Sequence, residues 1–359
     1  MSRLTIDWSA GKITEKNPTG LNGVDFIEFT GPDATHLDKL FLKMGFTLLS
    51  EIPGKKIKLY RQGDINFIVN AEPGTFAVNF AKLHGPSVSS TGFRVGDAQK
   101  AFEAAVKRGA KPYEGAEGTK GVTPYPAVYG IGDSLIYFID EKNHTDLYKE
   151  QFKLADLSVR PVGNSLDIVD HFTNNVPVGE MRKWSSFYTD IFGFYEAKYF
   201  DIKGKSTGLL SQAMRSPCGK FSVPINEPKD PKSQIQEYLN EYKGSGIQHI
   251  ALTTEDIAPT LETLSKSDVP FLSAPPKKYY EMLKTRLPQV TEDIDRLQRN
   301  AILVDGDEHG YLLQIFTKNT IGPVFFEVIQ RKGHEGFGDG NFQALFDAIE
   351  ADQRERGYL

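Results

Sequence analysis

The feature that most constrains the fold of this chain is an internal repeat. Residues 24–46 are weakly similar to residues 168–194, and in both a strand-like run leads through a helix-like stretch to a Gly-Phe start of the next strand. Residues 93–109 are in the same way similar to residues 249–264, where a strand runs into a helix that begins with acidic or capping residues. The order is therefore module one, module two, and the same two modules again.

A junction that contains Pro161 and Gly163 separates the two halves. We therefore predict one domain over residues 1–158 and a second over residues 159–359, within the 359 residues of the chain. Alternating apolar runs predict strands at residues 57–61, 65–69, 135–139, 312–316 and 324–329. The expected fold class is α+β, with tandem βαβββ modules. Short mixed sheets of this kind, covered by helices on one face, can curl into two open barrels whose concave faces form pockets.

The end of the chain has the pattern of an amphipathic helix. One helical face is apolar at Phe342, Leu345, Phe346 and Ile349. Three glycines at positions 336, 338 and 340 make the preceding loop pliable. Two interpretations stay open: a C-terminal helix that simply packs on a sheet, and a hinged lid over a pocket.

Composition excludes several classes of partner. The net charge is −5, from 42 Lys and Arg against 47 Asp and Glu, without a long basic run, so we expect neither nucleic-acid nor membrane binding. The amino terminus interrupts its few apolar residues with Arg3 and Asp7, which is not typical of a secretory signal, and we expect a cytoplasmic protein. Cys218 is the only cysteine, which excludes an internal disulfide and a cysteine-held cluster. A bound metal would need His, Asp or Glu ligands.

Two of the seven histidines stand out. His171 and His249 each lie on the first strand of a module in the second half, where strand alternation directs them to one sheet face. A histidine satisfied by a backbone carbonyl in the core is the plainer alternative for each. The other five occupy polar, Gly-containing or helix-surface contexts and are interpreted as solvated or structural: His36, His84, His144, His309 and His334.

A carboxylate at Glu327 interrupts an otherwise apolar strand, and an unpaired charge there would cost several kcal/mol. Two imidazoles and one carboxylate on one face form the facial triad of non-haem Fe(II) oxygenases, although zinc or Mn(II) fits the same ligands. Aligning the repeats places Glu28 opposite His171, Ser90 or Thr91 opposite His249, and a residue near Tyr137 opposite Glu327. The first half thus has no matching triad, and we expect one metal per chain.

Other polar residues on strand-like runs need buried partners: Gln314, Gln248 and Asn226. Hydrogen bonds to neighbouring backbone are the alternative for each. Arg331 and Lys332 follow the Glu327 strand, and we interpret them as a solvated turn rather than a carboxylate clamp.

Several motifs together resemble the 4-hydroxyphenylpyruvate dioxygenases, a family with the vicinal oxygen chelate fold. The resemblance covers nearly the whole chain. The matching motifs are Asp170-His171, residues 224–228, 233–236 and 246–249, the Pro275-Pro276 pair followed by Tyr279-Tyr280, and residues 313–316, 322–333 and 336–342.

The resemblance implies roles for individual residues. His171, His249 and Glu327 would bind Fe(II), in a catalytic second domain beside a structural first domain. The polar cluster that the family places around the phenol end of the substrate and the ring-hydroxylation step corresponds to Ser211, Asn226 and Gln234. The amides near the metal correspond to Gln248 and Gln314. The aromatic wall corresponds to Phe316, Phe325, Phe337 and Phe342, of which Phe342 would set the C-terminal helix over the cavity as a gate.

The implied reaction converts 4-hydroxyphenylpyruvate and O2 to homogentisate and CO2, by oxidative decarboxylation, ring hydroxylation and side-chain migration in tyrosine and phenylalanine catabolism. The keto acid is part of the substrate, so no 2-oxoglutarate is expected. Three alternatives stay open: a hydroxymandelate synthase, an extradiol catechol dioxygenase, and a noncatalytic aromatic-binding module on the same fold. We also expect a homo-oligomer, either a dimer or a tetramer.

Overall fold

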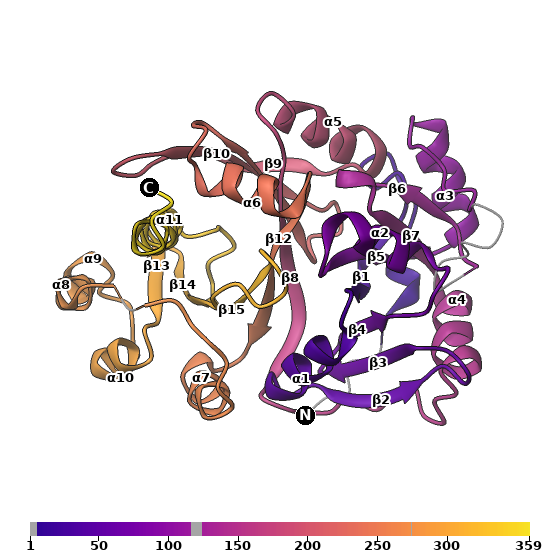
Figure 1. Ribbon diagram of the computed structural model, residues 1–359, viewed down its shortest axis with the longest axis horizontal. Coiled ribbons are helices and arrows are strands. Elements are labelled where there is room, and N and C mark those ends of the chain that lie inside the picture. The colour runs from indigo at the N-terminus through magenta and orange to yellow at the C-terminus, as the bar shows by residue number, and fades with distance from the viewer. Residues whose placement is uncertain (1–5, 116–123, 274) are drawn as a thin grey trace.

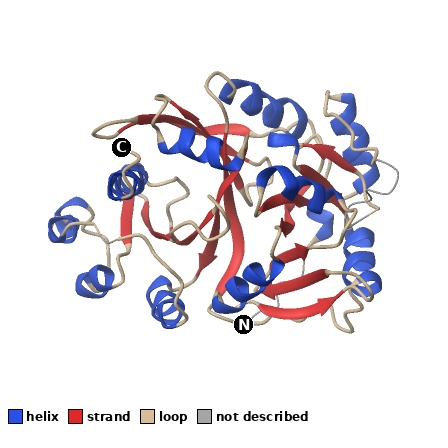
Figure 2. Cartoon of the chain, in the orientation of Figure 1, coloured by secondary structure: helices blue, strands red, loops and turns tan. Residues whose placement is uncertain are grey.

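A computed structural model describes residues 6–115, 124–273 and 275–359, so Arg3 lies outside the described residues. The chain forms two mixed sheets, one from each half (Figure 1). The seven-stranded sheet has the order β2-β3-β4-β1-β5-β7-β6, and the eight-stranded sheet has the order β13-β14-β15-β12-β8-β11-β10-β9. Helices pack along both sheets, which confirms the α+β class (Figure 2).

The first half contains the elements β1 (Leu21–Thr30), α1 (Ala34–Lys43), β2 (Thr47–Glu51), β3 (Ile57–Gln62), β4 (Ile65–Asn70), α2 (Phe76–His84), β5 (Ser87–Val95), α3 (Ala98–Lys107), β6 (Ala127–Tyr129), β7 (Leu135–Ile139) and α4 (Glu141–Thr145), with short turns η1 (Trp8–Ala10), η2 (Ile131–Asp133) and η3 (Asp146–Gln151). Asp33 and Asp97 begin α1 and α3 by accepting a hydrogen bond from a backbone N–H of the first turn.

The second half contains β8 (Leu166–Asn175), α5 (Met181–Phe192), β9 (Tyr195–Lys203), β10 (Gly208–Arg215), β11 (Ser222–Pro228), α6 (Gln234–Tyr242), β12 (Gly246–Thr254), α7 (Ile257–Lys266), α8 (Lys277–Glu281), α9 (Leu283–Arg286), α10 (Ile294–Arg299), β13 (Leu303–Asp307), β14 (Gly310–Phe316), β15 (Phe325–Lys332) and α11 (Asp339–Glu355). The five strands expected from alternation are therefore confirmed. The proposed domain boundary at residue 158 falls between η3 and β8.

Both sheets are built by the same pairing rules. An antiparallel pair, β1–β5 or β8–β12, forms the centre, and a parallel partner flanks each of its strands. The register pairs Glu28 with Ser90 and Ser90 with Leu135, whereas Ala251 pairs with both His171 and Glu327. Leu135, and not a residue near Tyr137, therefore occupies the place of Glu327 in the first half, and Ser90 occupies the place of Ala251 rather than that of His249.

One module departs from the expected βαβββ pattern. Among the described residues, the second module has only β6 and β7 after α3. Residues 111–113 approach β6 through a single antiparallel bridge between Pro112 and Val128. Tyr113 donates to Ala127 O at 2.9 Å and Tyr129 donates to Lys111 O at 3.0 Å on either side of this bridge, so Pro112 stands where the ladder needs no N–H and the pairing covers only these three residues.

The C-terminal helix α11 contacts both edge strands of the second sheet, β13 and β9, and also α6. It therefore spans the opening between the two edges of this curled sheet (Figure 1). A continuous aromatic core joins the two halves, with ring centroids 6.3 Å apart for Phe29 and Phe326 and 5.0 Å apart for Phe93 and Phe221. No helix in the described ranges has both the length and the apolar character required to cross a membrane.

Candidate active site

Three neighbouring central strands of the second sheet bring two histidines and a glutamate together. His171 lies on β8, His249 on β12 and Glu327 on β15. The register aligns His171, Ala251 and Glu327 in one row across the strands, so their side chains share a face. Ala251 contributes only a methyl group to the middle of this row, which leaves space between the two polar side chains.

The ligand atoms of this triad converge on one point. All lie within 4.8 Å of one another, and all three residues are buried. Glu327 Oε2 is 3.2 Å from Nε2 of His171 and 3.5 Å from Nε2 of His249. Within residues 6–115, 124–273 and 275–359, this is the one His/Cys/Asp/Glu group close enough to hold a metal. Two neutral imidazoles and one carboxylate suit a divalent transition metal and leave coordination positions open.

The pKa values of the two histidines suit a site in which a metal ion displaces a proton. Burial opposes a charged ring, but Glu327 and Asp170 raise the pKa of His171 to about 9. Burial, together with the charge on His171, holds the pKa of His249 well below its usual range. The metal-free site therefore keeps a proton on His171, and a bound metal would take the place of this proton.

Asp170 and Arg331 orient the first histidine. Nδ1 of His171 lies 2.8 Å from Asp170 Oδ1, and the Arg331 guanidinium donates to both Asp170 oxygens at 2.7 and 2.8 Å. Although burial opposes ionisation, Arg331 holds the pKa of Asp170 below its usual range. A carboxylate on Nδ1 fixes the tautomer that presents Nε2 to a metal. The interpretation of Arg331 as part of a solvated turn is thus wrong, because Arg331 lies within β15 and binds the buried carboxylate of Asp170.

The other two triad residues are also held by polar neighbours. Thr173 Oγ1 is 3.0 Å from Nε2 of His249, and Gln248 Oε1 is 3.1 Å from its Nδ1. Gln314 Nε2 donates to Glu327 Oε1 at 2.7 Å. Gln248 and Gln314 thus lie at the site as expected, and their contacts are with the triad side chains rather than with neighbouring backbone.

A cavity of about 40 Å³ adjoins the triad. Six further residues proposed from the sequence line it: Ser211, Asn226, Gln314, Phe316, Phe337 and Phe342. Pro224, from the 224–228 motif, also lines it, and three more lining residues gave no sequence signal beyond ordinary strand or helix apolarity: Phe200, Ala213 and Leu345. Phe342 packs edge-on against Phe200, with ring centroids 5.2 Å apart, so α11 and β9 meet over this cavity.

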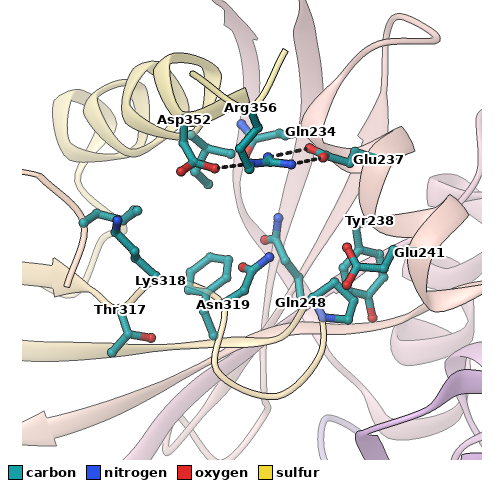
Figure 3. Close-up of a pocket in the computed structure, with 14 residues that line it drawn as sticks. Gln234, Glu237, Tyr238, Glu241, Gln248, Thr317, Lys318, Asn319, Asp352 and Arg356 are labelled. Atoms are coloured by element: carbon teal, nitrogen blue, oxygen red, sulfur yellow. Dashed lines mark hydrogen bonds and ion pairs between the residues drawn. The ribbon is translucent and has the colours of Figure 1, made fainter. Parts of the chain in front are cut away.

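Gln234, Gln248 and Phe325 instead line a second cavity of about 260 Å³ (Figure 3). Arg356 crosses its upper wall and binds Glu237 of α6 and Asp352 of α11. Phe325 stacks on the ring of His249, with centroids 4.8 Å apart, so it separates this cavity from the triad. The residues predicted from the sequence to surround one substrate therefore line two adjacent cavities in the structure.

Fold and site together define the class of protein. The sequence model described as "Glyoxalase/Bleomycin resistance protein/Dioxygenase superfamily" matches residues 168–315, where two of the triad residues lie. The model described as "Hydroxyphenylpyruvate dioxygenase, HPPD, N-terminal" matches residues 15–153.

Individual relatives cover almost the whole chain. Protein MelA of Shewanella colwelliana is 52% identical, over 96% of this chain and 99% of its own. A 4-hydroxyphenylpyruvate dioxygenase of Legionella pneumophila (strain Philadelphia 1) is 49% identical, over 96% of this chain and 98% of its own. The solved structure of a 4-hydroxymandelate synthase variant from Streptomyces coelicolor has a TM-score of 0.78 at 25% identity, covering 92% of this chain and 98% of that one. The chain belongs to the 4-hydroxyphenylpyruvate dioxygenase family.

Proposed function

We propose that this protein converts 4-hydroxyphenylpyruvate and O2 to homogentisate and CO2, with one Fe(II) held by His171, His249 and Glu327. The buried convergence of these three side chains on one point is the observation that carries the proposal. An Fe(II) ion at such a triad supplies redox chemistry with O2 and open positions for the carboxylate and keto oxygens of the substrate.

The chain's own residues prepare this site. The Asp170–Arg331 pair holds His171 in the tautomer that a metal needs. Gln314 donates a hydrogen bond to Oε1 of Glu327, so Oε2 is the oxygen that would face the metal. Both effects fix the ligands before the metal arrives.

An unpaired acceptor marks the far end of the cavity. Asn226 is 1% exposed, and its Nδ2 donates to Asn175 and Gln248, whereas its Oδ1 has no hydrogen-bond partner among the described residues. A buried carbonyl oxygen without a partner costs about 1–3 kcal/mol. The phenol hydroxyl of the substrate is a donor of suitable chemistry. Ser211 lies directly opposite Asn226 in the β10–β11 pair and completes a polar pocket for that hydroxyl.

The aromatic wall controls access. A cavity of about 40 Å³ is far below the several hundred cubic ångströms of an ordinary ligand pocket. Phe337 and Phe342, which line it from the loop before α11 and from its first turn, must shift when the substrate enters. Their return excludes water from the reacting groups.

Oxygen uptake tests the proposal. Purified protein with Fe(II) and 4-hydroxyphenylpyruvate is expected to consume O2 and release homogentisate. Hydroxymandelate as the product would instead support the synthase alternative, which attacks the benzylic carbon. Binding of the aromatic keto acid without O2 consumption would indicate a noncatalytic binding module. The homo-oligomeric state and the cytoplasmic location stay predictions from the sequence.

A further inference from the structure

The two carboxylate oxygens of Glu327 have different neighbours. Oε2 faces the Nε2 atoms of His171 and His249, whereas Oε1 accepts a hydrogen bond from Gln314 Nε2 at 2.7 Å. A carboxylate can only accept, so Gln314 must present its NH2 group to Glu327. Its carbonyl oxygen therefore points away from the triad and needs a donor of its own.

Asn341 on the first turn of α11 supplies that donor. Its Nδ2 lies 2.8 Å from Gln314 Oε1, and the side chain is fully buried. Asn341 Oδ1 then faces the Tyr279 hydroxyl at 3.1 Å. The two amide orientations are thus fixed from the carboxylate outward, because Asn341 donates to Gln314 and Gln314 donates to Glu327. The single Tyr279 proton is shared between Asn341 Oδ1 and Val304 O, which lies at 2.9 Å.

Backbone contacts around the start of α11 leave space for the hydrogen-bonded series Asn341–Gln314–Glu327 and hold it in place. Gly338 has φ +70°, and a Cβ on it would lie 3.1 Å from Gln314 Oε1. The N–H of Gly340 donates to Asp305 Oδ2 at 2.6 Å. The start of α11 is therefore fastened to β13 and β14 beside the triad.

The far end of α11 is held by separate contacts. Glu350 is 1% exposed and accepts from the N–H groups of Ser206 and Thr207 at 3.0 and 2.8 Å. Arg356 binds Glu237 of α6. Neither contact touches the triad, so the two ends of the helix can be perturbed independently.

We propose that Asn341 is a positioning residue for Glu327, acting through Gln314, so that docking of α11 and metal binding stabilise each other. This inference rests on the proposed metal site. A docked helix holds Glu327 with Oε2 toward the metal, and by linkage a bound metal favours the docked helix by the same factor. Asn341 touches neither substrate nor metal in this scheme.

Titration with Co(II) alone tests the proposal without relying on turnover. We expect Asn341→Leu to weaken Co(II) binding about tenfold, the range for loss of a group that supports a ligand. Gln343→Leu is the matched control. This residue lies on the same helix, and among the described residues its amide binds Lys203 and Asp347 rather than Gln314, so Co(II) binding should weaken far less than in Asn341→Leu.

Asn341→Asp is a second variant of the same size. It keeps the acceptor for Tyr279 but loses the donor to Gln314, so Co(II) binding should weaken despite the added negative charge. Thermal unfolding in a chelator checks that each variant is folded. Arg356→Gln removes a contact at the far end of α11. It should reduce Co(II) affinity only in proportion to the population of molecules in which α11 is undocked.

Hydrogen exchange of α11 provides the reciprocal measurement. Co(II) should slow exchange of the α11 amides in the unaltered protein, and Asn341→Leu should remove most of this slowing. Co(II) affinity equal to that of the unaltered protein in both Asn341 variants, or α11 exchange that does not respond to Co(II), would overturn the inference. Failure of the unaltered protein to bind Co(II) would instead count against the metal site itself.

Discussion

The two halves of the chain have the same sheet architecture, but the buried polar side chains on their central strands have different partners. In the first half, Glu28 accepts hydrogen bonds from Asn70, Ser89 and Ser90 at 2.8, 3.1 and 2.5 Å, all from the same sheet or its connections. In the second half, the ligand atoms of the triad lie within 4.8 Å of one another and face one point. A repeated fold therefore yields a metal site only in the half whose central strands direct two imidazole nitrogens and a carboxylate oxygen at the same point.

The first half also contains a buried ionic cluster whose charged groups are paired with one another. Asp25 is bound by Arg94 at 3.1 Å, by His144 at 2.8 Å and by the Tyr148 hydroxyl at 2.8 Å. Arg94 also pairs with Asp64 at 2.6 Å. Such a closed network stabilises the fold, whereas the second half keeps its ionisable groups available for a ligand.

Removing a ligand is the largest test of this contrast. His249→Ala should abolish metal binding and turnover while the protein stays folded, because β12 is held by its own ladders with β8 and β15. Metal analysis after dialysis measures the stoichiometry. The matched change in the first half, Glu28→Gln, should keep one metal per chain, and a full metal complement in His249→Ala would refute the assignment.

Removing a charge from the ionic cluster of the first half should lower the stability of the fold and leave metal binding unchanged. Asp25→Asn removes the buried carboxylate that accepts from Arg94, His144 and Tyr148, although Arg94 keeps its pair with Asp64, and we expect the free energy of unfolding to fall by about 3 kcal/mol. Urea unfolding measures this loss. Asp97→Asn, at an exposed position where Asn also caps a helix, is the control. A loss of metal binding in folded Asp25→Asn would contradict the division of roles between the halves.

The contact between Asp170 and His171 should have a smaller effect that is specific to the second half. Asp170→Asn removes the charge that orients His171 and leaves Arg331 without its partner, so metal affinity should fall about 10- to 100-fold. Metal titration measures the change, with Asp167→Asn on the same strand as control. Unchanged affinity would mean that the Asp170–Arg331 pair is structural.

The smallest expected effect is a pH dependence in the first half. Burial raises the pKa of Glu28, although its hydrogen bonds oppose the shift. An acid whose folded pKa is raised contributes stability below its unfolded pKa, near 4.5, and loses it as the pH rises through the folded value. The free energy of unfolding of Glu28→Gln should therefore rise relative to that of the unaltered protein as the pH increases above 4.5, which thermal unfolding at several pH values measures. A difference that does not vary with pH would contradict the shift.

The sequence was sufficient for features that depend on local pattern. His171 and His249 were identifiable because they lie at matched positions of the repeat, and Glu327 was identifiable because it interrupts an apolar strand. The Asp170–Arg331 pair was not identifiable, because both residues have ordinary local contexts and meet only through strand pairing. The missing strand of the second module depends on a single bridge at Pro112, which the repeat pattern alone does not reveal. The division of the predicted side chains between two cavities depends on how Phe325 packs on His249.

Ala251 has a consequence for how this fold tolerates substitution. A valine or leucine at this fully buried position would fill the space between His171 and Glu327 while keeping every charge and every strand pairing. Such a change looks conservative by hydrophobicity, yet it would close the coordination space and leave a folded, inactive protein. The side chain that keeps the coordination space open is therefore an apolar one, which a search among polar residues alone would miss.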